Sequence, residues 1–223
     1  MKEINKMLTH INYKPLASRQ IRFIIIHYTA NNGDTAKGNC NYFLKRYRGA
    51  SAHYFVDENS IWQCVEDKDV AWHIGARKYY TDARNENSIG VELCSRKDDS
   101  GVYYFKDEVV KNAQELVRYL AKKYDVTENR ILRHFDCTKK ICPAPFVNNI
   151  QAWEDFKKGL ELDNEMGYKI YNTLIEVPDW ARPSCEKAII ANVLRGTGSG
   201  LGLNDTELKM IVWLDRCGCF DEK

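Results

Sequence analysis

The sequence has neither an excess of charge of one sign nor a long hydrophobic run. Lysine and arginine together number 33 against 31 aspartates and glutamates, a formal net charge of +2, so no strong positive field attracts nucleic acid. No stretch approaches the ~18 apolar residues of a transmembrane helix, and residues 1–20 lack the apolar segment of a secretory signal. These absences predict a soluble protein, made in the cytoplasm, that binds neither nucleic acid nor membrane.

The sequence also lacks internal repeats, low-complexity tracts and a coiled-coil heptad run. Its 223 residues, 44% of them hydrophobic, suffice for one large domain or for a domain of common size with a small appendage. Eight cysteines in a chain without a secretory signal are expected to be reduced, buried or metal-bound rather than paired.

Hydrophobic patterns predict alternating strands and helices over the first 160 residues. An apolar β-branched run is typical of a buried strand, strict alternation of a half-buried strand, and apolar residues at helical spacing of a helix packed on a sheet. On these grounds we expect strands at 21–28, 52–56, 61–65 and 88–94, and helices at 36–47, 106–124 and 150–160.

The C-terminal part changes character. Residues 161–170 are a plausible linker, and 171–223 predict a small all-α domain with two helices. The first helix spans 177–196, led by proline and closed by glycine, and a Gly/Ser turn leads to a second helix capped by Asn204 or Asp205. So small a domain has a marginal core, and we expect it to dock on a partner or to form a homodimer.

The segment from Arg133 to Phe146, RHFDCTKKICPAPF, holds His134 and Cys142 eight positions apart. Pro143 and Pro145 argue against a helix just beyond, and irregular backbone lets two ligands converge on one ion. His27 closes the apolar strand upstream. Two histidines and a cysteine leave the fourth tetrahedral position of zinc open, the pattern of catalytic sites. Taken singly, His27 also fits a buried core histidine and Cys142 a buried thiol.

Five separated blocks resemble the zinc N-acetylmuramoyl-L-alanine amidases of the amidase-2 family. They are IIIHYTA at 24–30, SAHYFVDE at 51–58, AWHIG at 71–75, IGVEL at 89–93 and the 133–146 segment. The family is kin to the peptidoglycan recognition proteins and to a phage lysozyme, and the likeness is strongest to phage and prophage endolysins. It covers residues 20–158 and implies an α/β fold, with a mixed central β-sheet flanked by helices and a zinc at the floor of a groove.

The resemblance assigns roles to five residues. It makes His27, His134 and Cys142 the zinc ligands, matches Glu92 to the family's catalytic glutamate and matches Lys140 to a lysine beside the metal-bound water. Some relatives carry a tyrosine where this chain has Ala52, so the catalytic work is expected of Glu92 and Lys140. From the residues alone, Glu92 also fits a structural ion pair and Lys140 a solvated surface lysine.

The resemblance names peptidoglycan as the substrate, cut between N-acetylmuramic acid and L-alanine of the stem peptide. We expect Trp72 and His73 to line the groove, His73 being equally suited to supporting a ligand, and His53 to line the groove or to be structural. The alternative is a non-catalytic module that binds peptidoglycan; such members typically lose a zinc ligand. The C-terminal helices resemble small wall-binding segments of endolysins, and an endolysin would stay in the cytoplasm until released to the cell wall.

Overall fold

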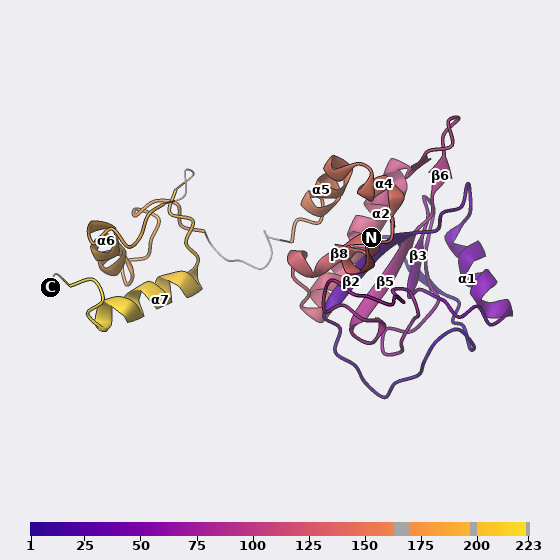
Figure 1. Ribbon diagram of the computed structural model, residues 1–223, viewed down its shortest axis with the longest axis horizontal. Helices are drawn as coiled ribbons and strands as arrows, with labels where there is room; N and C mark the ends of the chain where they lie inside the picture. The colour runs from indigo at the N-terminus through magenta and orange to yellow at the C-terminus, as the bar shows by residue number, and fades with distance from the viewer. Residues whose placement is uncertain (163–169, 197–199, 222–223) are drawn as a thin grey trace. The chain divides into compact units, whose positions relative to one another are not determined.

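The computed structural model describes residues 1–162, 170–196 and 200–221. The chain separates into two compact units, residues 1–162 and 163–223 (Figure 1). The linker predicted at 161–170 falls for most of its length on residues 163–169, which lie outside the described residues.

The larger unit is built on a six-stranded sheet with the spatial order β1-β4-β3-β5-β2-β8 (Figure 1). The strands are β1 (Ile4–Lys6), β2 (Phe23–Tyr28), β3 (Tyr54–Val56), β4 (Ile61–Gln63), β5 (Ser88–Leu93) and β8 (Ile131–Arg133). Only β3 and β4, the predicted hairpin, pair antiparallel; every other neighbouring pair is parallel. The sheet is therefore mixed, as expected.

Alternation along β2 and β5 divides their side chains between the two faces of the sheet, because successive residues of a strand point to opposite sides. Ile24 and Ile26 join the main hydrophobic core. Phe23 and Ile25 pack into a separate cluster on the other face, and the same alternation carries His27 to that face. The apolar run thus forms a strand buried on both sides, as its composition predicted.

Helices cover both faces of the sheet. On one face lie α2 (Asp107–Tyr124) and α5 (Ile150–Lys158), which contribute Leu116 and Phe156 to the main core. On the other, α1 (Ala36–Lys45) packs with Cys40 against Phe55 of β3. The predicted cap of α1 is confirmed, since the Thr35 hydroxyl accepts a hydrogen bond from the Gly38 N–H at 3.1 Å.

Several short elements escaped the sequence analysis. Among the strands they are β1, β8, and β6 (Arg96–Lys97) and β7 (Tyr103–Tyr104), which form a separate two-stranded sheet. Among the helices they are the 3-10 turns η1 (Asn85–Asn87) and η2 (Glu128–Arg130) and the short helices α3 (His134–Thr138) and α4 (Ala144–Val147). Elements of two to five residues show too little of a periodic pattern to be found. The expectation that prolines exclude a helix just beyond Cys142 was wrong, because Pro145 lies in the first turn of α4, where no N–H is needed.

The smaller unit holds α6 (Arg182–Ile190) and α7 (Asp205–Arg216) around a compact apolar cluster that includes Val177, Cys185 and Leu208. The helix predicted over 177–196 is shorter at both ends. Pro183 must sit at its start, because a proline inside the helix would break the hydrogen-bond ladder. Asn192, in the left-handed region at φ 58°, ends it before the glycine. The predicted Gly/Ser turn falls mainly on residues 197–199, outside the described residues.

The start of α7 agrees with the sequence analysis. The Asn204 side chain accepts hydrogen bonds from the N–H groups of Thr206 and Glu207, at 2.9 and 3.1 Å. The Glu207 carboxylate accepts one in return from the Asn204 N–H at 2.8 Å, so the two residues form a capping box.

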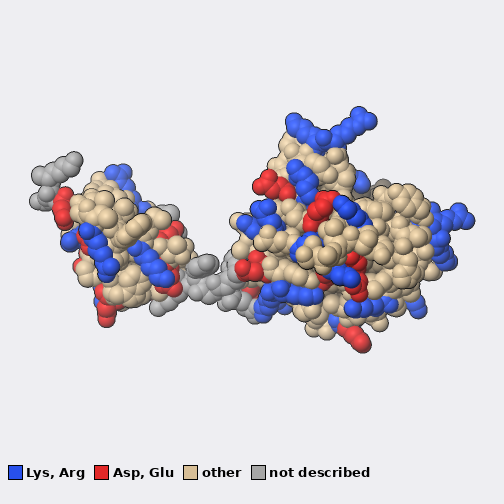
Figure 2. Space-filling view, turned by 90° about the horizontal axis from the view of Figure 1, so that it is seen from below, with Lys and Arg blue, Asp and Glu red and all other residues tan. Residues whose placement is uncertain are grey.

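Charges of both signs are interspersed on the face that Figure 2 shows, rather than gathered by sign. This distribution fits the near-balanced composition of the chain. Among the described residues, no helix is both long enough and apolar enough to cross a bilayer.

Candidate metal centre

Parallel strands bring the predicted site residues to one edge of the sheet. His27 is the second-last residue of β2 and pairs in register with Glu92, the second-last residue of β5. On the other side of β2, Ile26 pairs with Arg133 at the end of β8, and His134 follows directly as the first residue of α3. The carboxyl ends of neighbouring parallel strands are where ligands bind in open α/β sheets.

Three of these side chains form a compact donor cluster. One donor atom from each of His27, His134 and Cys142 lies within 4.8 Å of the other two, and all three residues are buried. The Cys142 Sγ is 3.7 Å from His27 Nδ1, and the rings of His27 and His134 meet edge to face with centroids 4.8 Å apart. The structure therefore joins the strand histidine to the distant RHFDCTKKICPAPF segment.

The cluster has the properties of a zinc site. Both ring nitrogens of His134 are buried without a hydrogen-bond partner, an arrangement that costs free energy unless a ligand takes them up. Burial lowers the pKa of His134 to about 4 and that of His27 well below its ordinary value, so both rings are neutral donors at pH 7. Two imidazoles and one thiolate suit zinc and leave its fourth position open.

A chain of hydrogen bonds behind His27 determines which of its nitrogens faces the cluster. The Ser88 hydroxyl donates to the Arg84 carbonyl at 2.6 Å, so its oxygen is free to accept from His73 Nε2 at 3.3 Å. His73 Nδ1 then accepts from His27 Nε2 at 3.0 Å. With its proton on Nε2, His27 turns the lone pair of Nδ1 toward Cys142. Such outer contacts orient metal-binding histidines.

Glycine at position 90 makes room for this support. A Cβ on Gly90 would lie 2.6 Å from His73 Cγ, a separation that real Cβ atoms essentially never show. Ser88 and Gly90 share the face of β5 that carries Glu92, and the sequence analysis missed both. The alternation of β5 could have placed them beside Glu92, although it names no partner for them.

Glu92, Lys140 and all three donors line one open cavity of about 710 Å³. The Glu92 Oε2 is buried without a protein partner. Burial raises the pKa of Glu92 to about 8, with the Asp34 carboxylate adding to the rise and the Lys140 ammonium opposing it. Lys140 itself is exposed at the cavity. Asp34, a second carboxylate in the lining, was not found from the sequence, where no pattern marks it.

The three residues expected at the substrate divide between two places. Trp72 and His73 line the cavity, although His73 also supports His27 from behind. His53 is fully buried behind the cavity wall. Its Nδ1 accepts from the Gly90 N–H at 3.0 Å, and its Nε2 lies 3.2 Å from the Asp69 carbonyl. Of the two roles left open for His53, these contacts fit the structural one, because its ring joins β5 to the loop before Trp72.

The fold and donor set define an α/β protein with a buried cluster of two histidines and a cysteine that could hold a metal ion at an open cavity. The family model described as N-acetylmuramoyl-L-alanine amidase matches residues 17–145. The chain belongs to this family, as the sequence motifs indicated.

Individual relatives agree with this assignment. The chain is 36% identical over 160 residues to the N-acetylmuramoyl-L-alanine amidase CwlL of Bacillus licheniformis, covering 67% of this chain and 42% of that protein. It is 35% identical over 160 residues to a probable N-acetylmuramoyl-L-alanine amidase of the same species, covering 67% and 43%. The chain thus spans less than half the length of these two relatives.

A solved structure shares the fold. The catalytic domain of XlyA, an amidase of Bacillus subtilis, superposes with a TM-score of 0.60 at 24% identity, covering 71% of this chain and 99% of that one. At this identity the likeness establishes the mixed sheet with its flanking helices and nothing further.

Proposed function

We propose that the chain is a zinc-dependent N-acetylmuramoyl-L-alanine amidase that acts on peptidoglycan in the manner of an endolysin. The observation that carries the proposal is the buried cluster of His27, His134 and Cys142, open to a cavity that also holds Glu92. Membership of the family and the activity for which its relatives are named indicate the substrate. The bond to be cut joins the lactyl carbonyl of N-acetylmuramic acid to the nitrogen of L-alanine.

His27 Nδ1, a ring nitrogen of His134 and the Cys142 sulfur would hold the zinc. Bound there, zinc lowers the pKa of a water and polarises a carbonyl. The other tasks of amide hydrolysis belong to the chain's own residues. His73 and Ser88 keep the proton of His27 on Nε2, and the burial of all three donor residues limits the access of bulk water to them.

Glu92 is suited to moving the proton. Its raised pKa of about 8 makes it a stronger base than an ordinary carboxylate, and its Oε2 has no competing protein partner. It takes a proton from the attacking water and returns it to the leaving nitrogen as the C–N bond breaks. The products are a carboxylate on the sugar and a free amine on the peptide.

Lys140 is suited to the carbonyl oxygen. Lys140 lines the same cavity as Glu92 and His134, and its ammonium acts to lower the pKa of both groups. A positive group held there stabilises negative charge that develops on the carbonyl oxygen during attack. Trp72, at the cavity wall, offers an aromatic face to a sugar ring.

The test is mass spectrometry of the soluble products released from purified peptidoglycan, with and without a chelator. The proposal expects stem peptides with a free N-terminal L-alanine, lost on chelation and restored by zinc. Glu92→Gln should keep zinc and lose roughly 10²–10⁴-fold in turnover, whereas Glu86→Gln is a matched control on the surface. Binding to the wall without release, even with added zinc, would favour the non-catalytic module instead.

A further inference from the structure

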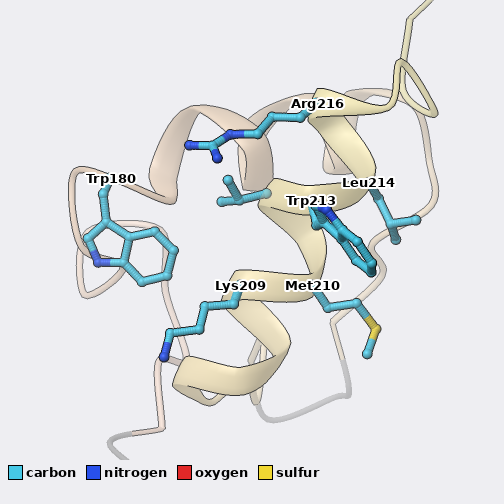
Figure 3. A pocket seen from close by; sticks show the side chains of 7 residues that line it. Trp180, Lys209, Met210, Trp213, Leu214 and Arg216 are labelled. Atoms are coloured by element: carbon cyan, nitrogen blue, oxygen red, sulfur yellow. The ribbon is translucent and has the colours of Figure 1, made fainter.

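The smaller unit carries an exposed apolar surface that its core does not use. Trp180 is 51% exposed, Met210 57% and Trp213 73%, and all three line one open hollow of about 770 Å³. With Lys209 and Arg216 they make up what we call the tryptophan shelf (Figure 3). Large apolar side chains exposed together mark binding surfaces more often than single exposed residues do.

Helical spacing explains the layout of the shelf. Lys209 and Arg216 are seven residues apart on α7, two turns along one face. Trp213, four residues after Lys209 and three before Arg216, belongs to the same face. Lys209 and Arg216 extend toward Trp180, whereas Met210 and Leu214 project away from it (Figure 3). The apolar side chains of the shelf are therefore bordered by one ammonium group, of Lys209, and one guanidinium group, of Arg216.

The charge of the shelf is one-sided. The seven residues that line the hollow include Lys209 and Arg216 and no acidic residue. The carboxylate of Asp215, their near neighbour in sequence, is taken up by Ser184 at 2.7 Å and Lys187 at 3.0 Å. A second copy of the chain meeting this surface by two-fold symmetry would bring cations against cations, which argues against homodimerisation through it. The shelf fits a partner with apolar faces and negative charge.

The proposed reaction produces such a partner. Cutting the amide frees the lactyl carboxylate of each N-acetylmuramic acid, so the glycan left behind is a chain of sugar rings with regularly spaced carboxylates. Pyranose rings present apolar faces that pack on tryptophan, and carboxylates pair with lysine and arginine. A polymer of flexible polyol phosphates would match the cations but offers no rings for Trp180 and Trp213.

We infer that the tryptophan shelf binds the peptide-free glycan strand that the amidase reaction leaves, and so holds the enzyme on wall it has already cut. This inference rests on the proposed function for the identity of the strand. The site is separate from the zinc cavity, because every shelf residue belongs to the smaller unit.

The test uses the full chain and glycan strands from which another amidase has removed the stem peptides. Binding is measured by co-sedimentation and by tryptophan fluorescence, against the same strands with their carboxylates converted to methylamides. We expect roughly tenfold weaker binding after this conversion, and a similar loss for Trp213→Ala and for Arg216→Gln. Trp213→Tyr, which keeps a ring, should retain most of the affinity.

Matched controls come from the same unit. Ile190 is 81% exposed and lies outside the shelf, so Ile190→Ala should bind as the parent chain does. Arg195→Gln makes the same change of charge as Arg216→Gln at a position that contacts only Asn192 among the described bonds, and it should also bind normally. Equal binding of methylamidated and free strands, or unchanged binding by both shelf variants, would overturn the inference.

Two further results would separate this inference from the proposed function. If the chain releases no peptides yet binds the stripped strands through Trp213, the inference about the shelf stands and the proposed amidase function fails. If the chain releases peptides normally while its shelf variants bind the strands unchanged, the amidase function stands and the inference about the shelf fails. Elution of the parent as a dimer that Trp213→Ala converts to monomer would assign the surface to a second copy and refute glycan binding.

Discussion

Zinc binding to the metal-free chain should release protons in a number that the structure predicts. Burial, with the charge of Glu92, raises the pKa of the Cys142 thiol to about 12. Zinc binds the thiolate, so the thiol proton must leave when the metal enters. At pH 7 that deprotonation costs about 7 kcal/mol, since each pKa unit is worth about 1.4 kcal/mol. The two histidines add no protons, because their lowered pKa values leave them neutral.

Glu92 supplies a second, pH-dependent contribution. With a pKa of about 8 it is about 0.9 protonated at pH 7 and about 0.1 protonated at pH 9 in the metal-free chain. A cation in the cavity favours the carboxylate, so the proton is lost on binding. These two side chains are therefore expected to release about 1.9 protons at pH 7 and about 1.1 at pH 9, and ionisation of a metal-bound water adds to both values. Zinc affinity therefore rises with pH.

Isothermal titration calorimetry in buffers of different ionisation enthalpy counts these protons. The exposed Cys217 and Cys219 are replaced by serine so that they take up no metal. Glu92→Gln is the informative variant, since it should release about 0.9 fewer protons than the parent chain at pH 7 and about 0.1 fewer at pH 9. A release near zero would refute thiolate ligation by Cys142. Equal release by the parent chain and Glu92→Gln at pH 7 would refute the coupling of Glu92 to the metal.

Further predictions concern the support of the site and the stability of each unit. His73→Ala removes the acceptor for His27 Nε2 and should weaken zinc binding roughly 10–100-fold in a chelator competition; unchanged affinity would remove His73 from the site. Gly90→Ala should displace His73 and lower zinc affinity in the same assay. Unchanged zinc affinity would mean that the structure around His73 moves to accept the added Cβ. Leu116→Ala, at a fully buried position of α2, should cost about 2–5 kcal/mol in urea unfolding, and a loss below about 1 kcal/mol would contradict the packing described. Asn204→Ala removes the cap of α7 and should cost about 1 kcal/mol, seen as faster amide exchange at the start of that helix; equal exchange would refute the capping box.

Long elements with a clear period were predictable. The apolar run that became β2 and the helical stripe of α2 each repeat a pattern several times, and both were placed correctly. The three residues of β8 are too few to show a repeating pattern, yet β8 positions His134 beside His27. The residue types made His27 a candidate partner of His134, and the family resemblance strengthened the pairing, but their contact depends on strand order, which local sequence does not encode.

The two roles left open for His53 have the same origin. The block SAHYFVDE gives no sign of which face its histidine takes, because His53 precedes β3 and the alternation of that strand starts only at Tyr54. Burial settles its role, since both ring nitrogens meet backbone groups of Gly90 and Asp69. The role of His73 was left open between contacting substrate and supporting a metal ligand. Its hydrogen bonds to His27 and Ser88 favour the supporting role, although His73 also lines the cavity.

The parallel arrangement of β2, β5 and β8 accounts for why one edge of the sheet gathers all the chemistry. Alternation sends His27 and Glu92 to the same face, so the donor atom His27 Nδ1 and the Glu92 carboxylate reach the cavity from neighbouring strands. The opposite parity sends Ile26 and Val91 into the main core. A one-residue slip of β2 against β5 would exchange these sets, burying the histidine among aliphatic residues and exposing isoleucine to the cavity. The apolar packing that fixes this register therefore also fixes the geometry of the metal site.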